Sequence, residues 1–347
     1  DNDNDLEIVF YGYTSSGDVF AINHNGSTVP NFPVQLNEKV LKGGAIYDLN
    51  NNGKDDIVVA TENDKLIAII YDNGTIVNLF ESTDKFKSAP SIIDYNNNII
   101  ITAGDEGGNF YGINLDGSLA FNIITGNNIR SSAGFIDFNN QLGIFFGSED
   151  GNLYGIDMNG NNLNGWPQNI SGDNNESKIN ASPIFADINN DNTPEVISAS
   201  ENGQLIIYHL DGTPYEGFPL NYNYGFIGSP SITDIDNDDD LEIIIGTSQN
   251  LNVIDLKETT NNNQNYWNTY QGDSHRSGVY VYNGSNLSIG DLNNDGLIDV
   301  LDLVMVINII IGNSTPSSDQ LITADLNIDG TIDVLDVVQL INHILDN

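Results

Sequence analysis

The apolar positions of this chain follow two patterns, one typical of short strands and one typical of helices. Over residues 1–280, short β-rich runs such as Glu242-Ile-Ile-Ile-Gly246 alternate with turns rich in Gly, Asn and Asp. Near the C-terminus, residues 303–311 and 337–345 form two longer apolar runs. The first pattern predicts β-sheet, and the second predicts two helices.

The strand pattern repeats along the chain. A segment of small residues, then apolar residues, then Asp recurs five times, with steps of 46, 43, 50 and 47 residues between the Asp positions. A β-rich run, a Gly/Asp turn and a second strand follow each segment. A period in the forties with about four short strands predicts propeller blades, because a β-helix has shorter rungs and separate sandwich domains would not recur this often. The five anchoring residues are Asp48, Asp94, Asp137, Asp187 and Asp234.

Three of the anchors begin an acidic loop with oxygen-bearing side chains at positions 1, 3, 5 and 9. These repeats resemble the FG-GAP/VCBS-type β-propellers, as in integrin α-subunit heads and many secreted bacterial proteins. The resemblance implies one Ca²⁺ per matching loop, and the alternative is an Asp/Asn-rich turn that needs no metal. The candidate ligands are Asp48, Asn50, Asn52 and Asp56; Asp187, Asn189, Asp191 and Glu195; Asp234, Asp236, Asp238 and Glu242.

The loops that begin at Asp94 and Asp137 depart from this pattern. Both lack the acidic residue at position 9, and the next strand arrives several residues early. We therefore expect tight hairpins without metal at these two blades. Calcium would then occupy only some blades, with roughly two to four ions on the propeller.

The first residues align with the loop that begins at Asp234. In this alignment Asp1 takes position 3, and Asp1, Asp3 and Glu7 are candidate ligands. The first blade is then predicted to lack its innermost strand in this chain. Either the chain is a fragment of a longer protein or the strand comes from elsewhere. Counting this partial unit gives six blades, within a predicted range of six or seven.

After the last blade, the chain resembles the Trp…Arg-x-Gly tail that ends many secreted propellers of this kind. The matching residues are Trp267, Arg276 and Gly278. We expect this tail to wrap the ring closed, with Trp267 buried and Arg276 paired with an acidic loop.

Two twelve-residue loops near the C-terminus, 34 residues apart, share one ligand pattern. Each has Asp or Asn at positions 1, 3, 5, 9 and 12, and glycine at the sharp turn of position 6. Position 7 offers its backbone carbonyl. This is the spacing with which a loop wraps Ca²⁺, and the alternative is a pair of acidic surface turns. The candidate ligands are Asp291, Asn293, Asp295, Leu297, Asp299 and Asp302, then Asp325, Asn327, Asp329, Thr331, Asp333 and Asp336.

Each of the two loops has Asp at position 12 and is followed by one helix. This duplicated unit resembles a type I dockerin. The resemblance implies two Ca²⁺ ions, a small three-helix fold and docking onto a cohesin or another extracellular protein. Dockerins of cellulose-degrading assemblies carry small hydroxyl residues at positions 10 and 11, where this chain has Val-Leu twice, and no Lys or Arg follows Arg276. An apolar and acidic partner surface is therefore expected, unless these residues bury against each other or against the preceding domain. The candidate partner-binding residues are Val300, Leu301, Ile307, Asn308, Val334, Leu335, Ile341 and Asn342.

The predicted fold class is thus mainly β, with a propeller and a small all-α domain. The expected domains are residues 1–282 for the propeller and its tail, 283–288 for a linker, and 289–347 for the dockerin-like domain.

Composition limits the partners. The chain has 49 acidic and 10 basic residues, for a formal net charge of −39, which disfavours nucleic acid and anionic membranes. It has no cysteine, so disulfides and thiolate metal sites are excluded. No apolar run approaches the ~18 residues of a membrane span, so membrane insertion is not expected. These features and the two resemblances favour an extracellular or cell-surface location.

Catalytic motifs are not evident. The four histidines are scattered, and no nucleophile elbow, phosphate-binding loop or His-Glu-x-x-His motif occurs. The leading hypothesis is a non-catalytic, calcium-stabilised module whose propeller recognises protein or carbohydrate and whose tail domain docks. The alternatives are a propeller glycosidase or polysaccharide lyase targeted by a dockerin, and a structural surface protein that assembles through its tail.

Overall fold

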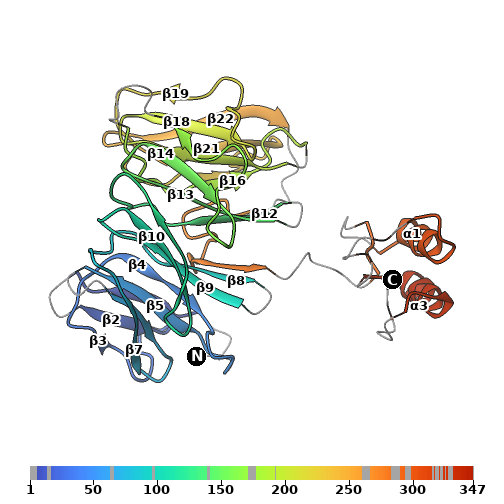
Figure 1. Cartoon of the computed structure of the whole chain (residues 1–347), viewed down its shortest axis with the longest axis horizontal. Coiled ribbons are helices and arrows are strands. Elements are labelled where there is room, and N and C mark those ends of the chain that lie inside the picture. Colours follow the sequence, from blue (N-terminus) through green and yellow to red (C-terminus); the bar gives the residue numbers. More distant parts are fainter. Residues whose placement is uncertain are drawn as a thin grey trace. The chain divides into compact units, whose positions relative to one another are not determined.

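The chain divides into two compact units, Asp1–Val281 and Tyr282–Asn347. The first unit holds the strands and the second holds the helices (Figure 1). The computed structural model describes residues 6–13, 17–62, 66–95, 98–138, 141–170, 177–191, 193–259, 266–282, 290–293, 298–314, 316, 320, 323–324, 326 and 331–346.

The strands of the first unit form six antiparallel sheets in chain order, which we call blades 1 to 6. Blade 1 contains β1 (Ile8–Tyr11), β2 (Asp18–Ile22) and β3 (Val34–Gln35). Blade 2 contains β4 (Val40–Tyr47), β5 (Asp56–Thr61), β6 (Leu66–Ile70) and β7 (Ile76–Glu81). Blade 3 contains β8 (Ser91–Tyr95), β9 (Asn98–Gly104), β10 (Asn109–Asn114) and β11 (Leu119–Ile124).

The later blades repeat this order. Blade 4 contains β12 (Gly134–Phe138), β13 (Gln141–Gly147), β14 (Asn152–Ile156) and β15 (Gln168–Asn169). Blade 5 contains β16 (Ile184–Ala186), β17 (Glu195–Ala199), β18 (Gln204–His209) and β19 (Leu220–Asn221). Blade 6 contains β20 (Ser231–Thr233), β21 (Asp240–Gly246) and β22 (Leu251–Thr259). The predicted repeat of short strands is confirmed.

The core lies between neighbouring blades. The first strands approach one another, since β4 contacts β8 and β12 contacts β16. The second strands are apolar on both faces because both faces are covered, and every residue of β5 and of β17 is buried. Between blades 3 and 4 the rings of Phe110 and Phe146 stack with their centroids 3.8 Å apart. Such aromatic pairs bury large areas and join one blade to the next.

The two blades with shortened loops form tight hairpins, as predicted. The pairing of β8 with β9 continues up to the Tyr95–Asn98 pair. The pairing of β12 with β13 continues up to the Phe138–Gln141 pair. The anchoring carboxylate of Asp94 accepts a 2.5 Å hydrogen bond from the Tyr47 hydroxyl of blade 2. Asp94 therefore forms a contact between blades 2 and 3.

The tail, residues 266–282 with strand β23 (Val279–Tyr282), runs along the first strands of the blades. Its backbone carbonyls accept N–H groups from four blades. These bonds run from Ile46 to Ser277 (2.8 Å), Ile92 to Gly278 (2.7 Å), Phe185 to Trp267 (2.9 Å) and Ile232 to Asn268 (3.1 Å). The tail thus links blades 2, 3, 5 and 6 through one segment.

One of the two side-chain predictions for the tail is confirmed. Trp267 is buried, and its ring meets that of Phe135 edge-on at 5.0 Å between centroids. The predicted pairing of Arg276 with an acidic loop is wrong for the described residues, among which this exposed side chain forms no ion pair. Within the same turn, the carboxylate of Asp273 accepts hydrogen bonds from the amide and hydroxyl of Ser277.

A chain of ion pairs connects blades 2 to 5. Glu62 of blade 2 lies 2.8 Å from Lys87, which precedes β8, and Glu149 of blade 4 lies 3.1 Å from Lys178, which precedes β16. Arg130 completes the chain, 2.6 Å from Glu149 and 3.8 Å from Glu106. The acids follow second strands and the bases precede first strands, so the blade repeat generates the alternation of charge.

The second unit contains α1 (Val300–Ile310) and α3 (Val334–Asp346), which pack together. Its core includes Leu292, Val306, Ala324 and Leu340. Among the described residues, no helix has both the length and the apolar character needed to cross a membrane.

Candidate metal centres and docking faces

The three acidic loops of the propeller share a backbone conformation. At position 4 each has an Asn with positive φ: Asn51 (56°), Asn190 (58°) and Asn237 (61°). Asn adopts this left-handed region more readily than most residues with a side chain. The residue reverses the chain between positions 3 and 5, so the flanking side chains can gather on one side. Sequence reasoning assigned no role to this position.

The position 9 carboxylates fix the ends of these loops. Each accepts a hydrogen bond from the backbone N–H of position 2, across the base of the loop. These bonds run from Leu49 to Asp56 (3.1 Å), Ile188 to Glu195 (3.0 Å) and Ile235 to Glu242 (2.7 Å). A carboxylate has about four lone-pair sites, so the same group can also face a cation.

The loop that begins at Asp234 gathers the most carboxylates. Single oxygens of Asp234, Asp236 and Glu242 lie within 4.8 Å of one another, and a second group of the same compactness joins Asp238, Asp240 and Glu242. Asp240, at position 7, was not predicted as a ligand because that position needs only a backbone carbonyl in a calcium loop. Hard oxygen donors at this density suit Ca²⁺.

Electrostatics in this loop favour a cation. Desolvation raises the pKa of Asp236, and the nearby carboxylates of Asp238, Glu242 and Asp234 raise it further. Desolvation and the neighbouring Asp238 and Asp255 also raise the pKa of Asp240. These carboxylates resist ionisation together, and a bound divalent cation would relieve that repulsion.

The loop that begins at Asp187 is held by hydrogen bonds between its predicted ligands. The amide of Asn189 donates to Asp191 (3.1 Å), and the backbone N–H of Asp191 donates to Asp187 (3.1 Å). His209 Nδ1 lies 3.1 Å from the fully buried Glu195, a proximity that sequence reasoning missed. Strand pairing brings these two residues opposite each other.

The loop that begins at Asp48 is less acidic. The carboxylate of Asp48 accepts N–H groups from Asn52 (3.1 Å) and Gly53 (2.7 Å). The side-chain amide of Asn50 donates to Asp56 (3.1 Å), so this Asn turns its nitrogen toward position 9. Burial raises the pKa of Asp56 to about 6, although N–H groups of Asp72 and Leu49 act in the opposite direction.

The candidate site at the N-terminus is only partly described. Glu7 is half-buried and lies just before β1, but Asp1 and Asp3 fall outside the described residues.

In the second unit, the two position 12 carboxylates have matching surroundings. Both Asp302 and Asp336 are fully buried. Asp302 accepts N–H groups from Leu292 (2.8 Å) and Asp299 (2.9 Å), as Asp336 does from Leu326 (2.9 Å) and Asp333 (2.8 Å). Position 12 thus ties the start of each loop to the start of its helix.

The position 9 residues cap the helices. Asp299 accepts the N–H of Leu301 at 2.7 Å, and Asp333 accepts that of Leu335 at the same distance. Asp291 is buried at the start of the first loop. In the first loop the described ligand candidates thus include residues from both of its ends, Asp291 and Asn293 at the start and Asp299 and Asp302 at the end, whereas in the second loop only Thr331, Asp333 and Asp336 are described. Asp295, Leu297, Asp325, Asn327 and Asp329 lie outside the described residues.

The candidate docking residues are mostly exposed. At the start of α1, Val300 and Leu301 are 60% and 56% exposed, and at the start of α3, Val334 and Leu335 are 65% and 55% exposed. Ile307, Ile341 and Asn342 are also exposed, whereas Asn308 is half-buried. The apolar residues among these do not belong to the core of the helical unit. We call Val300, Leu301 and Ile307 the first docking face, and Val334, Leu335 and Ile341 the second docking face.

The fold and loops define a β-propeller with acidic loops, followed by a helical domain with a duplicated acidic loop. Comparison with known families gives the same division. Residues 187–245 match the FG-GAP-like repeat, and residues 289–345 match the dockerin type I domain. The predicted resemblances are therefore confirmed for these two segments, one an FG-GAP-like repeat within the propeller and the other a dockerin type I domain in the helical unit. Type I dockerins generally bind Ca²⁺ and cohesins, and proteins that carry them are generally extracellular or on the cell surface.

Solved structures support the propeller fold. BamB from Moraxella catarrhalis is 15% identical with a TM-score of 0.50, and the match covers 75% of this chain and 71% of that chain. Sqt1 from Saccharomyces cerevisiae is 13% identical with a TM-score of 0.53, covering 71% and 68%. The V. cholerae biofilm matrix protein Bap1 is 18% identical with a TM-score of 0.51, covering 67% and 39%. At these identities the similarity shows the fold alone. No curated protein matches the chain.

Proposed function

We propose that this chain is a non-catalytic, calcium-stabilised extracellular module that docks through its dockerin onto a cohesin-like partner. The observation that carries this proposal is the pair of exposed Val-Leu dipeptides, one at positions 10 and 11 of each calcium loop. Each loop fixes the start of its helix through Asp302 or Asp336. Calcium in the loop would therefore set the position of the dipeptide beside it.

The chemistry of the two docking faces indicates the partner. Large apolar side chains in water favour association with another apolar surface. Because the chain has no Lys or Arg after Arg276, a partner that recognises basic residues would find none on this domain. We expect a cohesin-like surface with an apolar centre and without a strongly acidic rim. The pseudo-symmetry of the loops gives the partner two alternative faces.

The test is binding to a panel of purified cohesin modules, measured by biolayer interferometry with calcium and with EDTA. We expect calcium-dependent capture by at least one cohesin. Leu301→Asp combined with Leu335→Asp should abolish it, whereas either single variant should still bind through the other face. The matched control is Leu251→Asp, because Leu251 is also an exposed leucine but lies in the propeller.

Capture that persists in the double variant, or an equal loss in both single variants, would contradict the two-face arrangement. If no cohesin binds, the docking partner belongs to another class of protein.

The propeller supplies the recognition part of this proposal. Its ligand class is protein or carbohydrate, and two to four of its loops would hold calcium. The loop from Asp234 to Glu242 is the best supported of these, because its carboxylates already converge.

A further inference from the structure

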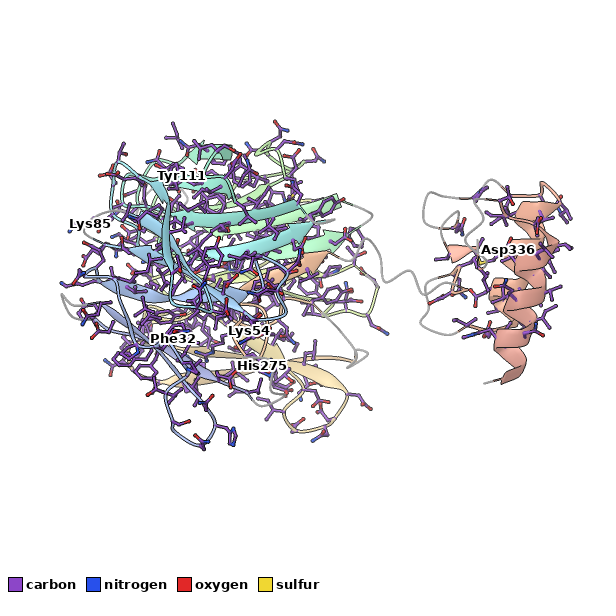
Figure 2. All side chains as sticks on the ribbon, turned by 90° about the horizontal axis from the view of Figure 1, so that it is seen from below. Phe32, Lys54, Lys85, Tyr111, His275 and Asp336 are labelled. Atoms are coloured by element: carbon purple, nitrogen blue, oxygen red, sulfur yellow. The ribbon has the colours of Figure 1, made fainter. Side chains whose placement is uncertain are left out.

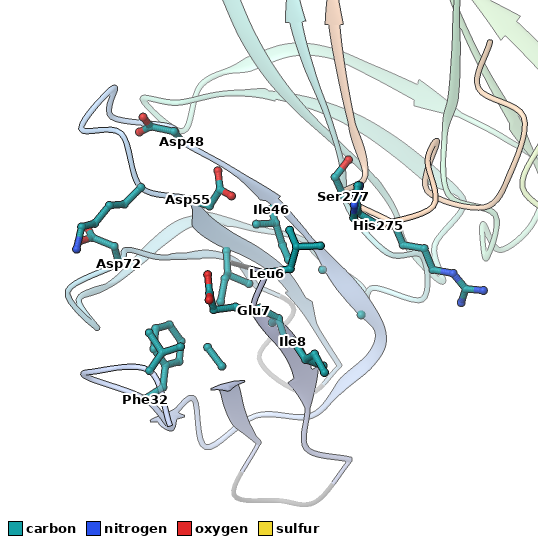
Figure 3. A pocket seen from close by; sticks show the side chains of 18 of the residues that line it. Leu6, Glu7, Ile8, Phe32, Ile46, Asp48, Asp55, Asp72, His275 and Ser277 are labelled. Atoms are coloured by element: carbon teal, nitrogen blue, oxygen red, sulfur yellow. The ribbon is translucent and has the colours of Figure 1, made fainter. Parts of the chain in front are cut away.

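The acidic loop of blade 6 differs from the loops of blades 2 and 5 at position 7. This position holds Lys54 in blade 2 and Thr193 in blade 5, but Asp240 in blade 6. Figure 3 shows the blade 2 loop, which begins at Asp48. A single Ca²⁺ needs only the backbone carbonyl of position 7. The side chain of Asp240 is therefore a carboxylate beyond the usual ligand pattern.

This additional carboxylate is buried and incompletely satisfied. Asp240 is 8% exposed, and no hydrogen-bond partner among the described residues faces its buried Oδ1 atom. A carboxylate oxygen of Asp240 lies within 4.8 Å of oxygens of Asp238 and Glu242. A buried charged oxygen without a partner is costly, and a bound ion or water commonly accounts for one. Water would satisfy the oxygen, but only a cation would also offset three neighbouring negative charges.

The five carboxylates of the loop form two sets that share Glu242. The first set adds Asp234 and Asp236, and the second adds Asp238 and Asp240; in each set, single oxygens lie within 4.8 Å of one another. Two oxygens bound to one Ca²⁺, each at about 2.3–2.6 Å, lie at most about 5 Å apart. Each set therefore fits around one ion. Because a carboxylate has two oxygens, Glu242 can face both ions.

Lys257 shows that the second set already attracts positive charge. Its ammonium group pairs with Asp255 and lies 4.0 Å from a carboxylate oxygen of Asp238. Lys257 has a positive φ of 60° beside an irregularity in the pairing of β21 with β22, and such irregularities redirect side chains. The side chain is 68% exposed, so it can move into water when a divalent ion arrives.

We propose that the blade 6 loop binds two Ca²⁺ ions and that Asp238, Asp240 and Glu242 hold the second. The ammonium group of Lys257 lies beside this second site and moves away when the ion binds. The proposal rests on the calcium-stabilised propeller proposed above and extends it. Three carboxylates leave several of the roughly six to eight coordination positions of Ca²⁺ for backbone oxygens and water.

The first experiment counts the calcium ions bound to the full chain, by equilibrium dialysis against calcium at physiological ionic strength followed by mass spectrometry of the metal. Asp236→Ala alters only the first set and Asp240→Ala only the second, so each should lower the count by one ion. The double variant should lower it by two. The matched control is Asp239→Asn, which removes an exposed carboxylate that belongs to neither set and should leave the count unchanged.

Folding of these variants is checked by near-ultraviolet circular dichroism. Asp240→Ala removes a buried carboxylate with a free oxygen, so the propeller should remain folded without the second ion. The two dockerin loops lie in a separate compact unit, so their ions should contribute equally to every count.

The second experiment tests the role of Lys257 by isothermal titration calorimetry with calcium alone. Lys257→Gln removes a positive charge beside the second site, so the ion that Asp240→Ala eliminates should bind about tenfold more tightly. In the Asp240→Ala background, Lys257→Gln should give a much smaller gain, because the second ion is already lost.

The outcomes separate this proposal from the one on which it rests. If Asp236→Ala loses one ion and Asp240→Ala loses none, the second ion is overturned while calcium stabilisation of this blade stands. If neither variant loses an ion, the loop binds no calcium and both proposals fail at blade 6. If Lys257→Gln gains an ion that the parent chain lacks, Lys257 is the permanent counter-charge, and a second ion in the parent chain is overturned.

Discussion

At the scale of single residues, the ion pairs between blades make the propeller sensitive to acid. Lys87 donates a hydrogen bond to Glu62, and with Lys85 and Lys39 it holds the pKa of Glu62 below its ordinary value. Because the folded pKa is lowered, the stabilisation is present above the unfolded pKa of about 4.3 and is lost as the pH falls through the folded pKa.

Glu62→Gln should therefore lower the free energy of unfolding by about 2 kcal/mol at pH 7, since a hydrogen bond to a charged group is lost. Urea denaturation at pH 7 and pH 3 measures this. The difference from the parent chain should shrink as the pH is lowered from 7 to 3, because Glu62 loses its charge as the pH falls through its folded pKa. The exposed Glu216→Gln is the control and should change little at either pH. A difference that does not shrink as the pH falls would contradict the electrostatic explanation.

Residue patterns located the acidic loops, but they did not predict the contacts around these loops. The spacing of oxygen side chains indicated each acidic loop, because calcium loops are local in sequence. The approach of His209 to Glu195 was missed because it depends on the pairing of β17 with β18. Asp240 was missed because position 7 normally contributes a carbonyl. The pairing of Arg276 with an acidic loop was wrong among the described residues, because a sequence motif does not fix the direction of a long, exposed side chain.

At the scale of elements, each dockerin helix depends on the loop before it. The fully buried Asp302 and Asp336 connect loop and helix in the two halves, and Asp336 lies in the first turn of α3 (Figure 2). Without a cation, carboxylates crowded in each loop repel one another by roughly 3 kcal/mol per pair at about 5 Å and an effective dielectric near 20. Short helices have little stability of their own.

Chelation should therefore unfold the helical unit. In EDTA the far-ultraviolet helical signal should fall, and added calcium should restore it. Asp291→Asn, at position 1 of the first loop, should weaken calcium binding at least tenfold by isothermal titration calorimetry. Asp346→Asn, outside both loops, should bind calcium like the parent chain. Helicity that is unchanged in EDTA would show that the unit folds without metal.

Whole elements were predictable to different degrees. The blade repeat and the two apolar helices follow from periodicity, so the sequence alone was sufficient for them. The resemblance of the tail to a closing segment led us to expect that it wraps the ring, but its partners Ile46, Ile92, Phe185 and Ile232 could not be named because they are spread over the chain. Contacts between residues so distant in sequence leave no local pattern.

At the scale of the whole molecule, the tail stabilises several blades at once. Trp267→Ala would remove a buried ring that contacts Phe135 and would leave a cavity between blades. We expect the propeller to lose about 3–5 kcal/mol of stability, measured by urea denaturation followed through near-ultraviolet circular dichroism. Tyr224→Ala, a half-exposed aromatic, should cost much less.

The same variant tests whether the two units are independent of each other. Because the units form their internal contacts independently, Trp267→Ala should leave the calcium titration of the dockerin helices unchanged. A shift in that titration would reveal coupling between the propeller and the dockerin.

The course of the tail also has a mechanical consequence. A dockerin held by a partner transmits any pull along the chain into β23, which pairs with β8. The load then reaches a segment that is hydrogen-bonded to several blades, so more than one bond must break before the tail can slide. A module built this way would bear tension between its anchor and whatever its propeller holds. Single-molecule stretching would record that resistance as one high rupture force.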